Sequence, residues 1–203
     1  KTIPNGTCHI TPCYAHDECT ILFTSGSTGK PKAVSLSHES VYGNANATLI
    51  ELPYSQDERL FIAIPFRFVS ALSHAVVTLI SGATLVGTEQ KLMAASLAKR
   101  VKALQATAFG GGPLQIRWLA NINGVDLSSL RWVMSSGDHL GRDTIGIMRS
   151  KWPDLKIFTA FGMTELGGRI CILQASDLDA NVGSVGHPID GLSVSVRNEN
   201  LEE

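Results

Sequence analysis

The hydrophobic pattern of the chain alternates between short apolar runs and longer segments with helical periodicity. Apolar runs bounded by turn residues predict strands over residues 20–24, 33–37, 60–64, 84–87, 107–109, 131–135 and 156–161, and short strands again over 182–196. Residue spacing and end signals predict helices over residues 38–51, 71–80, 91–104, 114–122 and 141–152. This alternation predicts an α/β fold with a mostly parallel sheet and helices on both faces. Ligands of such sheets bind beyond the carboxyl ends of the strands.

The helix expected over residues 38–51 has recognisable ends. Ser37 is the predicted N-cap, because its hydroxyl can accept a hydrogen bond from a free backbone N–H of the first turn. Pro53 follows the expected last residue closely, as is common after a helix end. The strand over residues 33–37 should therefore run directly into this helix.

The segment from Thr24 to Val34 reads T-S-G-S-T-G-K-P-K-A-V and follows an apolar run. Its two glycines allow the backbone to approach a ligand closely, and successive exposed N–H groups form a concavity that binds anions. Hydroxyl and ammonium groups in the same segment add further donors and positive charge. The candidate phosphate-binding residues are Thr24, Ser25, Gly26, Ser27, Thr28, Gly29, Lys30 and Lys32. The segment predicts a site for a nucleoside triphosphate.

The Walker A loop is the first comparison, and this segment departs from it twice. Thr24 stands where that loop has its first glycine, and Pro31 stands where it has a Ser or Thr that binds Mg²⁺. Pro31 also disfavours helical geometry at Lys30. The alternation after Pro31 predicts a strand, so the expected geometry is strand–loop–strand. An unrelated P-loop NTPase remains the less favoured alternative.

The string T-S-G-S-T-G-K-P-K resembles the phosphate-loop signature of the adenylate-forming superfamily, which includes acyl-CoA synthetases, adenylation domains of nonribosomal peptide synthetases and luciferase-like enzymes. Residues 158–168, F-T-A-F-G-M-T-E-L-G-G, resemble the aromatic-Gly-x-Thr-Glu element of that superfamily. Ser136 and Gly137 match its adenine-side loop, whereas Asp138 and His139 replace the commoner small residue and proline. Residues 181–191 resemble its G-S-V-G-x-P element.

The resemblance implies an enzyme that binds ATP and Mg²⁺ and activates a small-molecule carboxylic acid as an acyl-adenylate. The implied nucleotide-binding set is the phosphate segment, without Pro31, together with Ser136, Gly137, Phe161, Gly162 and Thr164. Lys32, Thr164 and Glu165 are the implied catalytic residues. Glu165 and Thr28 are implied to hold Mg²⁺, and a carboxylate beside a triphosphate needs such a cation between them. The acyl group then passes to CoA or to phosphopantetheine, which is carried in some members on a carrier domain.

The resemblance covers the central part of the superfamily's large N-terminal domain. Residues 17–203 are expected to form an AMP-binding core truncated at both ends, and residues 1–16 an N-terminal segment or linker. The C-terminal adenylation subdomain would then be missing. The alternative is therefore a catalytically incomplete, nucleotide-binding fragment of such an enzyme.

Composition excludes several other function classes. With 44% hydrophobic residues, 17% charged residues and a formal net charge of −1, the chain gives no electrostatic argument for nucleic acid. Apolar runs are too short for a membrane span, and the opening residues lack the apolar core of a signal peptide, so a cytoplasmic location is expected. The thiols of Cys8, Cys13 and Cys19, near His9 and His16, do not have the spacing typical of a zinc site.

Three further positions are open to a functional interpretation. The triplet Gly110–Gly112 precedes Pro113 and lacks the spacing of a dinucleotide loop, so we interpret it as a strand-to-helix turn. The resemblance implies that this turn lies near the acyl-binding wall of the superfamily. Arg67 is either a partner of an acidic substrate or an exposed loop arginine, and the second reading is favoured. His74 is expected on a helix face against the core, since no nucleophile and acid accompany it in a recognisable arrangement.

Overall fold

The computed structural model describes residues 11–24, 30–87 and 93–198. A two-stranded antiparallel hairpin consists of β1 (Glu18–Thr24) and β2 (Lys32–Ser37). The remaining strands are β3 (Arg59–Ile62), β4 (Thr84–Val86), β5 (Ala108–Gly111), β6 (Trp132–Ser136), β7 (Lys156–Met163), β8 (Gly168–Leu173) and β9 (His187–Pro188). The helices are α1 (His38–Glu51), α2 (Val69–Ile80), α3 (Ala94–Ala103), α4 (Pro113–Asn121) and α5 (Arg142–Lys151), with a 3₁₀ turn η1 (Thr164–Leu166).

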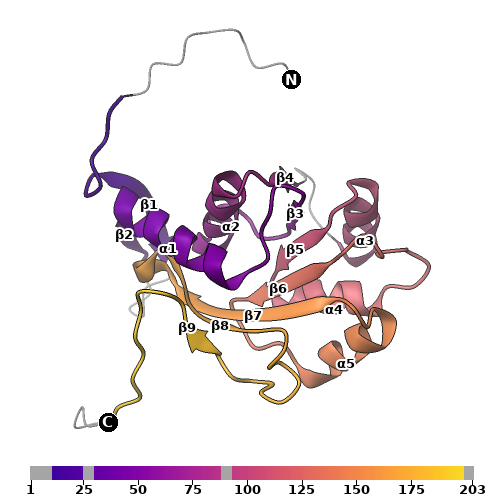
Figure 1. Cartoon of the computed structure of the whole chain (residues 1–203). Coiled ribbons are helices and arrows are strands. Elements are labelled where there is room, and N and C mark those ends of the chain that lie inside the picture. Colours follow the sequence, from indigo (N-terminus) through magenta and orange to yellow (C-terminus); the bar gives the residue numbers. More distant parts are fainter. Residues whose placement is uncertain (1–10, 25–29, 88–92, 199–203) are drawn as a thin grey trace, which may run out of the picture.

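The seven-stranded sheet has the order β4-β3-β5-β6-β7-β8-β9 (Figure 1). Strands β4 to β7 pair in parallel, β8 pairs antiparallel with β7, and β9 pairs antiparallel with β8. The two faces bury separate apolar clusters because side chains alternate along each strand. Phe61, Phe109 and Val133 pack on the face that α3, α4 and α5 cover, whereas Leu60 and Met134 lie on the face of α1 and α2. The predicted α/β fold with helices on both faces is confirmed.

Most elements occupy the predicted positions. Helix α1 has the predicted bounds, and the Ser37 hydroxyl accepts a hydrogen bond of 3.1 Å from the backbone N–H of Ser40, which confirms the N-cap. The helix expected from residue 91 begins at Ala94. The strand-to-helix turn expected over Gly110–Gly112 is shorter than predicted. Gly110 and Gly111 belong to β5, and Gly112 is the N-cap of α4.

The carboxyl-terminal part differs from the sequence analysis in two respects. The sequence analysis does not predict β8, whose apolar residues follow Gly168 and Arg169 at the start of the strand. The short strands expected over residues 182–196 reduce to the two residues of β9. Gly183, Gly186 and Gly191 adopt φ values of 100°, 84° and 79° there, and this left-handed backbone does not extend a strand.

The two strands of the hairpin flank the phosphate segment. Thr24 pairs with Lys32, so residues 25–29 connect two adjacent, hydrogen-bonded strand ends. The flanks thus confirm the strand–loop–strand geometry, while Ser25, Gly26, Ser27, Thr28 and Gly29 lie outside the described residues. Figure 1 shows the hairpin beside α1, which starts immediately after β2.

The buried side chain of Asn44 fastens α1 to the turn between β7 and β8. Its amide nitrogen donates hydrogen bonds to the carbonyl oxygens of Leu166 (3.3 Å) and Arg169 (2.7 Å). Its amide oxygen accepts a 3.2 Å bond from the backbone N–H of Arg169. This side chain therefore positions η1 relative to the helix that follows the hairpin.

A buried polar cluster joins α2 to β8. The Tyr54 hydroxyl lies 2.7 Å from Nδ1 of His74, and the Arg169 guanidinium donates a 2.5 Å hydrogen bond to the Ser73 hydroxyl. Burial raises the pKa of Tyr54 to about 12, against an opposing effect of the Arg169 charge, so the phenol keeps its proton. Burial, assisted by the same positive charge, holds the pKa of His74 well below 6.5. Both side chains are neutral at pH 7, and the expectation that His74 faces the core is confirmed.

Replacing Asn44 with alanine should destabilise the fold. The Asn44→Ala variant leaves buried backbone groups of the β7–β8 turn without partners, at a cost of about 2–3 kcal/mol in the free energy of unfolding. Urea denaturation measures this loss. Asn46→Ala is the matched control on the same helix, because the Asn46 side chain makes no hydrogen bond with another described residue. Equal stability of the two variants would refute the stabilising role of the Asn44 side chain.

The neutral state of His74 predicts a pH-dependent stability. Below about pH 6.5 the unfolded chain takes up a proton at His74 that the folded protein does not, so stability falls as pH decreases. The slope approaches about 1.4 kcal/mol per pH unit between pH 6.5 and the lower, folded pKa. Urea denaturation across this range should show the slope in wild type and lose it in His74→Gln. The exposed His139, changed to Gln, should leave it unchanged.

Candidate functional site

Loops at the carboxyl ends of the parallel strands surround a cavity of about 420 Å³. The wall from α2 and the segment before it includes Phe68 and Ser70, and the wall from α4 includes Gln115. The strand ends contribute residues from β6, β7 and the turn that follows β7, which are Ser136, Gly137, Phe161, Gly162, Met163 and Thr164. Parallel strands deliver their carboxyl ends to one edge of a sheet, and this edge is where ligands bind in α/β folds.

A second cavity, of about 340 Å³, adjoins the first across Phe161. Gly137, Asp138 and Phe161 line both cavities, and the second is closed by Leu178 and Gly183 from the chain after β8. The Phe161 side chain is 49% exposed, so its ring faces are accessible to a planar ligand. The edge therefore offers two adjacent compartments with one aromatic ring between them.

Glycine is required where β7 reaches this edge. A Cβ on Gly162 would lie 2.0 Å from the carbonyl oxygen of Gly168, and the register between β7 and β8 shifts at the same place. At the end of β6, Gly137 adopts a φ of 95°, which other residues rarely take. These backbone demands explain both glycines without reference to a ligand.

Glu165 extends from η1 into solvent. Gly167, with a φ of 75°, ends this turn and donates a 3.1 Å backbone hydrogen bond to the carbonyl of Thr164. Strand β2 lies against η1, so the strand that carries Lys32 neighbours the turn that carries Glu165. Within the described ranges, the Glu165 carboxylate has no hydrogen-bond or ion-pair partner, which leaves its oxygens free for a cation.

The structure brings together part of the predicted site. Ser136, Gly137, Phe161, Gly162 and Thr164 line one cavity, as the convergence of strand ends predicts. Thr24, Lys30 and Lys32 belong to the hairpin, and both lysines are exposed. The other five residues of the phosphate segment, at positions 25–29, lie outside the described residues.

Sequence reasoning missed the most buried charge at this edge. Arg169 lines the larger cavity although only 3% of its surface is exposed. The available signal was a charged residue inside the otherwise apolar run of β8. Arg67, by contrast, lies on an exposed loop with its guanidinium carbon 4.8 Å from the centre of the Phe68 ring, in agreement with the favoured interpretation.

Metal-ligating clusters give no competing site in the described ranges. No group of three His, Cys, Asp or Glu side chains there is arranged to hold a metal ion. Cys13 and Cys19 are exposed free thiols, and Cys8 and His9 lie outside those ranges. Every described helix is also too short or too polar to cross a lipid bilayer.

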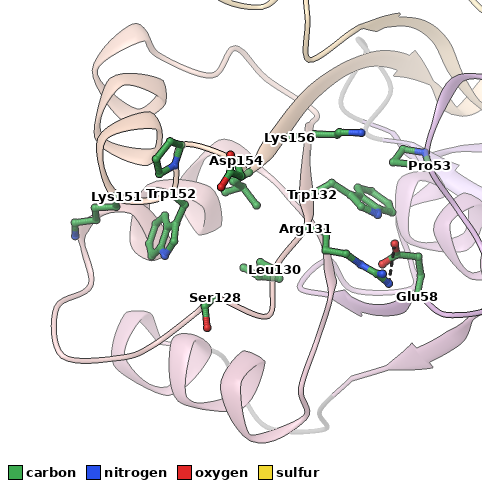
Figure 2. Close-up of a pocket in the computed structure, with 12 residues that line it drawn as sticks. Pro53, Glu58, Ser128, Leu130, Arg131, Trp132, Lys151, Trp152, Asp154 and Lys156 are labelled. Atoms are coloured by element: carbon green, nitrogen blue, oxygen red, sulfur yellow. Dashed lines mark ion pairs between the residues drawn. The ribbon is translucent and has the colours of Figure 1, made fainter.

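Another cavity, of about 500 Å³, lies at the opposite edge of the sheet (Figure 2). Trp132 and Lys156, the first residues of β6 and β7, line it together with Trp152. Arg131 pairs with the buried Glu58 at 3.0 Å, as the dashed line marks. None of the predicted site residues lines this cavity, so we assign the functional site to the carboxyl edge.

Comparison with solved structures identifies the same fold in larger proteins. The N-terminal domain of FACL13 from Mycobacterium tuberculosis, crystallised with an inhibitor, matches with a TM-score of 0.87 and 23% identity, over 96% of this chain and 49% of that one. O-Succinylbenzoate coenzyme A synthetase from Bacillus subtilis, in complex with ATP and magnesium ion, matches with a TM-score of 0.82 and 24% identity, over 92% of this chain and 38% of that one. The carboxyl-edge site thus lies in a fold shared with these proteins.

Sequence comparison agrees with the structural one. A feruloyl-CoA synthase from Amycolatopsis is 28% identical over 183 residues, which cover 87% of this chain but 36% of that protein. The chain therefore spans little more than a third of the length of that relative. The family model of the AMP-binding enzymes matches residues 4–203. This match covers nearly the whole chain, and the chain belongs to the family of AMP-binding, adenylate-forming enzymes.

Proposed function

We propose that the intact protein activates a carboxylic acid with ATP to form an acyl-adenylate. The observation that carries this proposal is the meeting of Ser136, Phe161 and Thr164, from the ends of two strands, at one cavity beside the turn that bears Glu165. The phosphate segment leaves from a hairpin whose second strand lies against that turn. A nucleotide held between the hairpin tip and the cavity would extend its adenosine toward Phe161.

The reaction needs positioning and charge neutralisation, and no protein nucleophile. A carboxylate oxygen of the acid forms a bond to the α-phosphorus, while the bond from that phosphorus to the oxygen bridging the β-phosphate breaks and pyrophosphate leaves. Negative charge develops on the α-phosphoryl oxygens and on the leaving group. Donors fixed before the reaction stabilise such charge most effectively. Thr164 is the proposed donor to the α-phosphate, and Lys32 with the phosphate segment is proposed to hold the β- and γ-phosphates.

The exposed carboxylate of Glu165 fits a magnesium site of the kind found with nucleotides. Mg²⁺ in such sites takes one or two protein carboxylates and completes its coordination with phosphate oxygens and water. The free Glu165 carboxylate, without a metal-binding cluster around it in the described ranges, suits that arrangement. We propose Thr28 as its companion ligand. The cation would neutralise the triphosphate and the pyrophosphate that leaves.

A thiol is the proposed acceptor of the acyl group. The feruloyl-CoA synthase and the O-succinylbenzoate coenzyme A synthetase carry coenzyme A in their names, which favours CoA over a carrier-bound phosphopantetheine. The C-terminal adenylation subdomain would be required for this second half-reaction. The alternative proposal is a catalytically incomplete, nucleotide-binding fragment. It is retained because this chain spans only part of the length of its relatives.

Neutralising Glu165 should depress adenylation and leave the fold intact. In the intact protein, Glu165→Gln removes the proposed metal ligand, and we expect acid-dependent ATP–pyrophosphate exchange to fall by at least about 100-fold. The control is Asp154→Asn, an exposed carboxylate at the opposite edge of the sheet, which should retain wild-type exchange.

Three outcomes of this assay separate the functions. Exchange that requires a carboxylic acid and Glu165 supports the adenylating enzyme. Nucleotide binding without exchange, for any acid, supports the incomplete fragment. ATP hydrolysis that needs no acid would support a P-loop NTPase, and full exchange in Glu165→Gln would remove the metal assignment.

A further inference from the structure

The larger carboxyl-edge cavity contains a buried cation. Arg169 belongs to β8 and pairs across the sheet with Gly162, which lines the same cavity. The absence of a side chain at Gly162 lets the two strands approach closely, since a Cβ there would lie 3.1 Å from the Cα of Arg169. The Arg169 side chain is 97% buried in the described structure, so water does not hydrate most of its charge.

The guanidinium of Arg169 lacks an anion. One of its terminal nitrogens donates to the Ser73 hydroxyl, and the neutral Tyr54 phenol lies close enough to interact with the guanidinium, but Nε and the other terminal nitrogen make no hydrogen bond to a charged group among the described residues. No carboxylate forms an ion pair with Arg169 in that part of the chain. A guanidinium has five N–H donors in a planar fork that matches a carboxylate. Leaving such a group buried and unpaired is costly, because the protein interior does not replace its hydration.

The neighbours of Arg169 do not supply the missing charge. Tyr54 and His74 are neutral at pH 7, and Asn44 contacts only the backbone of Arg169. Burial lowers the pKa of Arg169, but arginine keeps its proton at pH 7. Asp138 lines the cavity from the β6 side, but it is exposed and its carboxylate accepts a 2.7 Å bond from the backbone N–H of His139.

We propose that this cavity selects a carboxylic acid with a second anionic group, whose far carboxylate pairs with Arg169. The proposal rests on the adenylation proposed above, in which the first carboxylate attacks the α-phosphorus near Thr164. Both residues line the same cavity of about 420 Å³, so a compact diacid can span it. A purely hydrocarbon tail in the same space would leave the guanidinium without a partner.

Matched pairs of acids test the selection in the wild-type intact protein. Succinate against butyrate, glutarate against valerate and isophthalate against benzoate differ chiefly by the second carboxylate. Isothermal titration calorimetry at pH 7 gives the affinities without turnover, and pyrophosphate exchange gives activity. A charge-assisted hydrogen-bonded pair should make at least one diacid bind on the order of tenfold to a hundredfold more tightly than its monoacid. Equal or weaker binding of every diacid would overturn the proposal.

Two variants connect the preference to Arg169. Arg169→Gln should abolish the diacid preference and leave the thermal midpoint of the unliganded protein unchanged or higher, because an unpaired buried charge is removed. If Arg169 had only a structural role, its replacement by Gln would lower that thermal midpoint and leave the diacid preference intact. Arg169→Lys, which keeps the charge without the fork, should retain part of the preference, and it decides the matter if the Gln variant does not fold. The exposed Arg67, changed to Gln, should behave as wild type.

Failure of this inference and failure of the proposed function give different results. Exchange with monoacids as good as with diacids would refute the selection and keep the adenylating activity. Diacid binding that depends on Arg169, with no exchange for any acid, would keep the selection and refute the activity.

Discussion

The hydrogen bonds of one buried amide hold the candidate site together. Asn44 joins α1 to the backbone on both sides of the β7–β8 turn, at Leu166 and Arg169. Since α1 continues directly from the hairpin, these bonds relate the phosphate segment to Glu165 across more than a hundred residues of chain. The N-cap at Ser37 fixes where α1 begins. It therefore also fixes the position of Asn44 along the helix axis. The geometry of the edge thus depends on a polar side chain that takes no part in the proposed chemistry.

Close approach of backbones is the second constraint. At Gly162 the strands β7 and β8 come so near that a methyl group would overlap the Gly168 carbonyl. The same contact sets the direction in which β8 continues, and with it the burial of Arg169 behind the cavity wall. A glycine in a strand weakens it through backbone entropy and the loss of packing. Here that cost is offset by the pairing of a strand that is buried along its whole length.

Sequence reasoning succeeded where the determining interactions are local. Ser37 and Pro53 predict the two ends of α1, and Pro31 and the alternation after it predict the hairpin. It failed at β8 and over residues 182–196, where strand pairing depends on partners distant in the chain and on positive φ values at Gly183 and Gly186. The motifs identified Phe161 and Thr164, which do line the cavity, but no local rule points to Asn44.

Arg169 and His74 illustrate why the proposed ligand selectivity of the carboxyl edge also depends on residues that are distant in the chain. They belong to one buried cluster, in which burial and the cationic guanidinium together keep the imidazole neutral. A protonated His74 would place two positive charges side by side in a poorly hydrated interior, so only one cation is tolerated there. That remaining charge stays on the residue that borders the cavity. An anion arriving from the cavity is then the partner that satisfies the guanidinium without a second buried protein charge, which turns an electrostatic cost of folding into selectivity for the ligand.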